Sequence, residues 1–118
     1  METELKTIFG TGVTVGSVLI PAAHLQYYGS EKKYVTWEII DETPDVVAED
    51  EDDVYFSCSV DVTICAIGGY KDIKNAVMHL MHENGWLWSE TSPEMYDTET
   101  KMYSRVITFT KEGYTDNA

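Results

Sequence analysis

Residues 54–66 read VYFSCSVDVTICA, and this stretch decides the fold class that the sequence predicts. Apolar residues occupy every second position, which is the period of a β-strand with one buried face. The apolar face carries Val54, Phe56, Cys58, Val60, Val62, Ile64 and Ala66. The opposite face carries Tyr55, Ser57, Ser59, Asp61 and Thr63. Because seven apolar side chains share one face, another element has to cover them.

The expected cover is a helix over about residues 70–83. Its apolar residues recur at helical spacing, and they are Ile73, Ala76, Val77, Leu80 and Met81. Two glycines precede this segment at positions 68 and 69, and Asn84 and Gly85 follow it, as is typical of a helix end. A second, short helix is indicated near the N-terminus by Leu5, Ile8 and Phe9, followed by Gly10 and Gly12.

The remaining strands are predicted from shorter patterns. Residues 27–34 indicate a hairpin with its turn near positions 29 and 30, and residues 34–39 alternate as a half-buried strand. Further strands are expected at 86–88 and 102–110, while residues 13–28 stay open between strand and loop. The fold class predicted is α+β: a mostly antiparallel sheet of about four to five strands, with one long helix packed across it and a short N-terminal helix.

Length and charge bound the function. The 118 residues predict a single domain, 1–118, with a net charge of −13 from 21 acidic and 8 basic residues. Such a chain is poorly equipped to bind nucleic acid non-specifically or an anionic membrane surface. Eight acids lie between positions 41 and 53, which predicts a solvated acidic loop over 43–53. The polar tail 111–118 is expected to fray, and no segment is apolar for the ~20 residues that span a bilayer.

No complete catalytic or metal-binding motif is found, and neither an enzyme nor a cofactor is predicted. His79, His82 and Glu83 share a helix end, but their order matches no zinc-hydrolase motif and no third ligand is evident. The interpretation favoured is that two histidines complement a helix C-terminus. Cys58 and Cys65 fall on opposite faces of one strand, which excludes a disulfide between them.

Aromatic residues are the other signal of function. Three tryptophans and eight tyrosines are more than a small core uses, and aromatics concentrate at protein interfaces. The candidate interface aromatics are Tyr27, Tyr28, Tyr55, Tyr70, Trp86 and Trp88. The alternative is that the tryptophans cap the ends of the core.

The order of elements resembles a known family. The resemblance rests on LKTIF at positions 5–9, YVTWEI at 34–39 before the acidic stretch, the long alternating strand, GY at 69–70, NGW at 84–86 and MYSRVITF at 102–109. Together these segments look like the tail terminator, or tail completion, proteins of long-tailed bacteriophages and prophages.

The resemblance implies a virion structural protein that forms a hexameric ring, caps the tail tube, ends its polymerisation and joins it to the head connector. The implied partners are further copies of the chain, the tail tube protein and the head completion protein. DNA passes through such a ring without being bound by sequence. The chain would be made in the host bacterial cytoplasm and end at the head-proximal end of the tail. A partner-facing or channel-facing loop is expected at Glu49, Asp50, Glu51, Asp52 and Asp53.

Three alternatives stay open. An acidic chain of this size is suited to imitate DNA and inhibit a DNA-binding protein. The chain is also compatible with another head–tail completion or minor tail protein. A metal-dependent hydrolase that uses His79 and His82 is the weakest of the three, because it lacks a third ligand.

Overall fold

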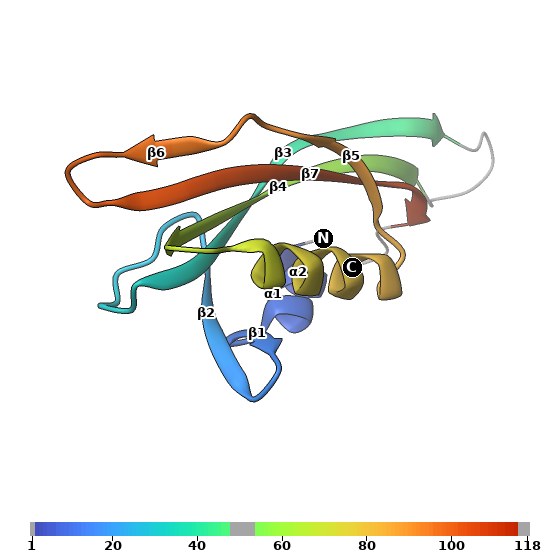
Figure 1. The fold of residues 1–118 in the computed structure, drawn as a ribbon. Coiled ribbons are helices and arrows are strands. Elements are labelled where there is room, and N and C mark those ends of the chain that lie inside the picture. Colours follow the sequence, from blue (N-terminus) through green and yellow to red (C-terminus); the bar gives the residue numbers. More distant parts are fainter. Residues whose placement is uncertain (1, 48–53, 116–118) are drawn as a thin grey trace.

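The computed structural model describes residues 2–47 and 54–115. Within these residues the chain forms two helices and seven strands (Figure 1). In chain order they are α1 (Glu2–Phe9), β1 (Gly12–Val15), β2 (Val18–His24), β3 (Lys33–Val47), β4 (Val54–Ile67), α2 (Lys71–Glu83), β5 (Leu87–Thr91), β6 (Met95–Asp97) and β7 (Met102–Thr115).

The described strands form one curled, mixed sheet in the order β1-β2-β3-β4-β7-β5, with β6 also paired to β7. Strands make up 53% of the chain, whereas the two helices together have 21 residues. The predicted α+β fold, with four to five strands and one long helix packed across them, is therefore wrong. The helices are short, with 8 and 13 residues, and extra strands arise from segments that the sequence left open or assigned to turns.

Both helices lie on the concave side of the curled sheet (Figure 1). The strands β3, β4 and β7 lie over one side of the two helices, and β1 and β2 lie on the other side of the helices. A sheet can curl in this way because strands twist, and the register shifts within β3–β4, β4–β7 and β5–β7 add local bends. The curl leaves room for the helices inside. In the strand order, β1 is at one end and β5 at the other, with β6 also paired to β7.

Apolar residues from all of these elements meet in one core. The alternating strand is confirmed as β4, and its residues from Cys58 to Ala66 that were expected to face the core are at most 1% exposed. The two expected helices are confirmed as α1 and α2. They bury Leu5 and Phe9, and Ile73, Val77 and Met81. Full burial of each such side chain contributes about 1.5–3 kcal/mol.

The hairpin predicted over residues 27–34 is wrong. β2 and β3 flank this segment and run parallel, with Ala22 opposite Val35 and His24 opposite Trp37. Parallel neighbours cannot be joined by a tight turn. The connection from His24 to Lys33 is short for parallel strands. It suffices because β2 and β3 overlap by only three residue pairs, so the chain has a short distance to run back before β3 begins.

The acidic loop is shorter than predicted. β3 continues to Val47 and pairs with β4 as far as Val54, so residues 43–47 are strand. Beyond Trp37 no described strand pairs with the other edge of β3, and a register shift follows Pro44. Such places tolerate a proline within a sheet. Residues 49–53, expected to face a partner or channel, lie outside the described residues.

The predicted fraying of 111–118 is wrong for residues 111–115. They extend β7 and pair with β4, with Lys111 opposite Cys58 and Thr115 opposite Tyr55. Residues 116–118 lie outside the described part of the chain. Neither described helix combines the length and the apolar character needed to cross a bilayer.

Candidate interaction surfaces

Large apolar side chains are exposed at the β5–β6 end of the sheet. This β5–β6 surface consists of Leu87, Trp88, Met95, Tyr96 and Tyr103, which are between 38% and 63% exposed. β5 and β6 lie on the outer side of β7, with no further described strand beyond them. The exposed side chains therefore accompany an unpaired strand edge, and an edge of this kind is a template for pairing with another chain.

A second apolar surface lies at the opposite end of the strand order. The first two residues of β2, Val18 and Leu19, follow the turn from β1, are 57% and 54% exposed and form what we call the β1–β2 tip. Gly16 in this turn has φ +62°, a conformation that favours glycine. Gly12 permits the close approach of the two strands, because a Cβ there would lie 2.3 Å from the Ile20 carbonyl oxygen.

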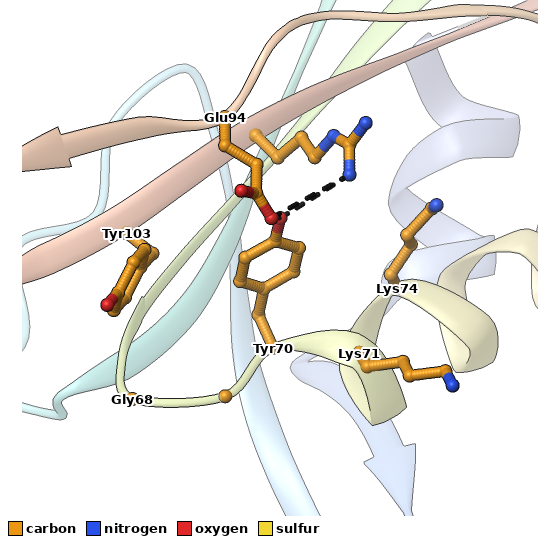
Figure 2. A pocket seen from close by; sticks show the side chains of 8 residues that line it. Gly68, Tyr70, Lys71, Lys74, Glu94 and Tyr103 are labelled. Atoms are coloured by element: carbon orange, nitrogen blue, oxygen red, sulfur yellow. Dashed lines mark hydrogen bonds and ion pairs between the residues drawn. The ribbon is translucent and has the colours of Figure 1, made fainter.

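A pocket of about 530 Å³ lies between the start of α2 and the β6–β7 hairpin (Figure 2). Its charged lining residues are Lys71, Lys74, Glu94 and Arg105. The rest of its lining is Tyr70, Tyr103 and the glycines at positions 68 and 69. We call it the Arg105 pocket. Two tyrosine rings, three cations and one carboxylate give it both an apolar wall and a positive one.

Hydrogen bonds hold the central side chains of this pocket in place. Arg105 donates from Nε to the Ser92 carbonyl oxygen at 3.0 Å and from Nη1 to the Tyr70 hydroxyl at 3.4 Å. The Tyr70 hydroxyl in turn donates to Glu94. Burial and the hydrogen bond to Glu94 raise the pKa of Tyr70, and Arg105 acts in the opposite direction. Tyr70 therefore stays a hydrogen-bond donor at neutral pH.

The predicted interface aromatics fall into different environments. Tyr28 is 86% exposed and Trp88 57% exposed, whereas Tyr27 is half-buried and stacks on Tyr34 with ring centroids 4.6 Å apart. Tyr70 lines the Arg105 pocket. Tyr55 belongs to β4 in a segment whose side chains lie outside the description.

Trp86 corrects the prediction for that group, because it is 1% exposed and belongs to the core. Two residues apart on a strand, Trp86 and Trp88 would share a face. Trp86 instead precedes β5, and its backbone N–H donates to the Met81 carbonyl at the end of α2. The chain therefore turns Trp86 inward as it leaves the helix.

Sequence reasoning missed most of the residues in these surfaces. The β5–β6 surface includes Met95 and Tyr96, which lie between the strands predicted at 86–88 and 102–110, where no strand was expected. The β1–β2 tip lies within residues 13–28, which the sequence left open between strand and loop. In the Arg105 pocket, Tyr70 meets Glu94 across 24 positions and Arg105 across 35, so no local pattern joins them.

The histidine and cysteine side chains considered as candidate reactive groups lie outside the pocket. His79 contacts Glu83 at 2.8 Å on the exposed side of α2, and within the described residues no group of three or more metal-ligating side chains forms. Cys58 and Cys65 are free thiols, as predicted. Burial, followed by the Glu42 carboxylate, raises the pKa of Cys58 to about 11, which makes it a poor nucleophile at neutral pH.

Comparisons with known proteins add no assignment: no protein-family model matches the chain, and no curated protein is significantly similar to it in sequence.

Proposed function

We propose that this chain is a structural protein that closes into a ring of identical copies, as a tail terminator of a long-tailed bacteriophage does. One observation carries the ring: two different apolar surfaces, β5–β6 and β1–β2, lie at opposite ends of the same sheet. When one surface of a subunit binds a different surface of the next, the contact is head-to-tail. A head-to-tail contact produces a ring whenever the rotation between subunits closes.

The chemistry of the two surfaces supports this contact. Leu87 and Trp88 on one side, and Val18 and Leu19 on the other, are each more than half exposed. A tryptophan at the centre of an interface is a frequent source of binding energy. The unpaired edge of β5 adds backbone hydrogen bonds to whatever strand or turn packs against it.

The net charge of −13 opposes association of identical copies. Salt screens this repulsion over about 10 Å at 0.1 M and over shorter distances at higher concentration. Ring formation through apolar surfaces is therefore expected to strengthen as the salt concentration rises. Assembly through ion pairs would weaken under the same conditions.

The ring is tested with two variants that each lose one surface. Leu87→Ser with Trp88→Ser removes the two most exposed side chains of the β5–β6 surface, and Val18→Ser with Leu19→Ser removes the β1–β2 tip. Light scattering is expected to show a concentration-dependent ring for the parent chain and monomers for each variant alone. An equimolar mixture of the two variants is expected to form a dimer, because one intact surface remains on each.

The control is Tyr28→Ser, which removes a side chain that is 86% exposed and belongs to neither surface; it should assemble like the parent. A parent chain that stays monomeric at every concentration contradicts the ring. A mixture that stays monomeric contradicts the head-to-tail contact.

The tail role is tested separately, with tail tubes prepared without their terminator. Electron microscopy is expected to show the chain as a cap at one end of the tube, and added subunits of tube protein should no longer extend that end. Capped tubes should then join to heads through the connector. If the chain forms rings that bind nowhere on the tube, the proposal of a ring stands and the proposal of a tail role is refuted.

A further inference from the structure

The Arg105 pocket concentrates positive charge in a strongly acidic chain. Three of the eight basic residues line it, against one of the 21 acidic ones. Lys71 and Lys74 form no ion pair with any described residue. Unpaired cations around a concave surface create a local positive potential that attracts anions, even where the net charge is negative.

An internal carboxylate already occupies part of this pocket. The Tyr70 hydroxyl donates to Oε1 of Glu94, and Nη1 of Arg105 lies 4.0 Å from the same oxygen (Figure 2). The Glu94 side chain is 62% exposed, whereas that of Arg105 is 27% exposed and held by the Ser92 carbonyl. Ion pairs with an exposed partner are weak. Arg105 is thus held in place independently of Glu94, whereas the Glu94 carboxylate is exposed and accessible to competition by another carboxylate.

We propose that the Arg105 pocket binds a carboxylate carried by a peptide segment of a partner protein, which replaces Glu94 on Tyr70 and Arg105. Lys71 and Lys74 at the side of the pocket attract the incoming segment and contact its negative charge. The inference does not depend on ring assembly. Tyr103 is the one pocket residue that also belongs to the β5–β6 surface, and none of the pocket residues is changed in the two ring variants.

The size and walls of the pocket fit a peptide better than a single ion. A volume of about 530 Å³ is within the range of pockets that hold organic ligands. The Tyr70 and Tyr103 rings, with centroids 6.4 Å apart, offer apolar contact beside the charged groups. A Cβ at Gly69 would meet no atom within 4 Å, so the backbone there is open to a neighbouring chain.

A carboxylate suits this site better than a phosphate. A phosphate group carries about −1.5 to −2 charges at pH 7, so the overall charge of −13 opposes its binding more strongly than that of a singly charged group. A carboxylate carries one charge and matches the group that Tyr70 and Arg105 already hold.

The test is a titration of the ¹⁵N-labelled chain followed through the amide signals of Gly68, Gly69 and Lys71. The host is the Leu87→Ser, Trp88→Ser variant, which keeps every pocket residue. The probes are acetyl-Ala-Glu-Ala-amide, acetyl-Ala-Ala-Ala with a free carboxyl terminus, the neutral acetyl-Ala-Gln-Ala-amide and inorganic phosphate. Saturable shifts with the first or second probe identify a side-chain or a terminal carboxylate as the ligand.

Substitutions in the pocket should change the affinity in opposite directions. Glu94→Gln removes the competing carboxylate and is expected to tighten peptide binding about two- to fivefold, whereas Glu99→Gln, a matched change outside the pocket, should not. Lys71→Gln with Lys74→Gln should weaken binding by about fivefold or more. The control, Lys32→Gln with Lys33→Gln, makes the same change in net charge elsewhere and should leave the affinity unchanged.

Gly69→Leu adds a bulky side chain to the lining of the pocket, where its Cβ would meet no atom within 4 Å, and is expected to abolish the shifts. Absence of saturable shifts with both carboxylate probes overturns the proposal. Equal weakening by the two lysine pairs also overturns it, because the binding would then follow net charge alone. Tighter binding of inorganic phosphate than of either peptide overturns the carboxylate assignment.

Discussion

β4 and β5 belong to the same sheet but stand in opposite relations to the core. β4 pairs on both sides, with β3 and β7, and alternates between buried and half-buried residues from Ser57 to Ala66. β5 pairs with β7 along one side, and four of its five residues are exposed. The core of this chain thus satisfies the apolar residues of β4 but leaves Leu87 and Trp88 without a cover. The ring contact proposed above uses apolar residues of that second kind.

The largest effect expected from this comparison is on folding stability. Ile64→Ala removes a side chain that is 1% exposed on β4 and should lower the free energy of unfolding by about 2–5 kcal/mol. Trp88→Ala on β5 should change it by about 0.5 kcal/mol or less when measured on monomers. Urea unfolding followed by circular dichroism checks both values. A large loss for Trp88→Ala in the monomer would show that β5 is covered within the chain, and would break the comparison.

A smaller effect concerns the buried thiol of β4. The unfolded Cys58 thiol ionises near its ordinary pKa of 9.0, while burial keeps the folded thiol protonated to about pH 11. The contribution of this group to stability is therefore complete below pH 9 and declines as the pH rises towards 11. The unfolding free energy of the parent should fall more steeply over this range than that of Cys58→Ala. Parallel slopes for the two proteins would contradict the burial of the thiol.

The smallest effect is expected at Trp86, the buried counterpart of Trp88. Its indole Nε1 is buried and has no hydrogen-bond partner among the described residues. Trp86→Phe removes that unsatisfied donor, which costs about 1–3 kcal/mol, and leaves a small cavity of comparable cost. The net change in unfolding free energy should stay within about 1 kcal/mol. A loss of several kcal/mol would mean that Nε1 has a partner, such as an ordered water.

The elements that the sequence predicts correctly are those with a strong internal period. β4 repeats its apolar residues over most of its length, and α2 repeats Ile73, Val77 and Met81 on one side. In each case the buried face is visible within the element itself. Periodicity, however, does not identify a strand's neighbours, so the parallel pairing of β2 with β3 was missed.

Charge and turn residues misled the prediction elsewhere. The dense acids from Asp41 onward led to the prediction of a loop over 43–53, but β3 tolerates exposed carboxylates such as Asp41 and Glu42 while its backbone pairs with β4 as far as Val47. The short strand β6 lies close to Pro93 and the turn at 98–101, and those signals hid it. The Arg105 pocket combines three segments of the chain, which only the folded sheet and α2 bring together.

The parallel junction between β2 and β3 bears on how the molecule opens. Three residue pairs join them, reinforced by the His24 ring stacked on Trp37 at 4.1 Å. The antiparallel pairing of β3 with β4 extends over nearly their full length. Segments with few shared hydrogen bonds open at a lower free energy than the whole fold. Backbone pairing alone would therefore let α1–β1–β2 open before the rest, and the burial of Leu5, Phe9 and Ile20 in the common core opposes this opening.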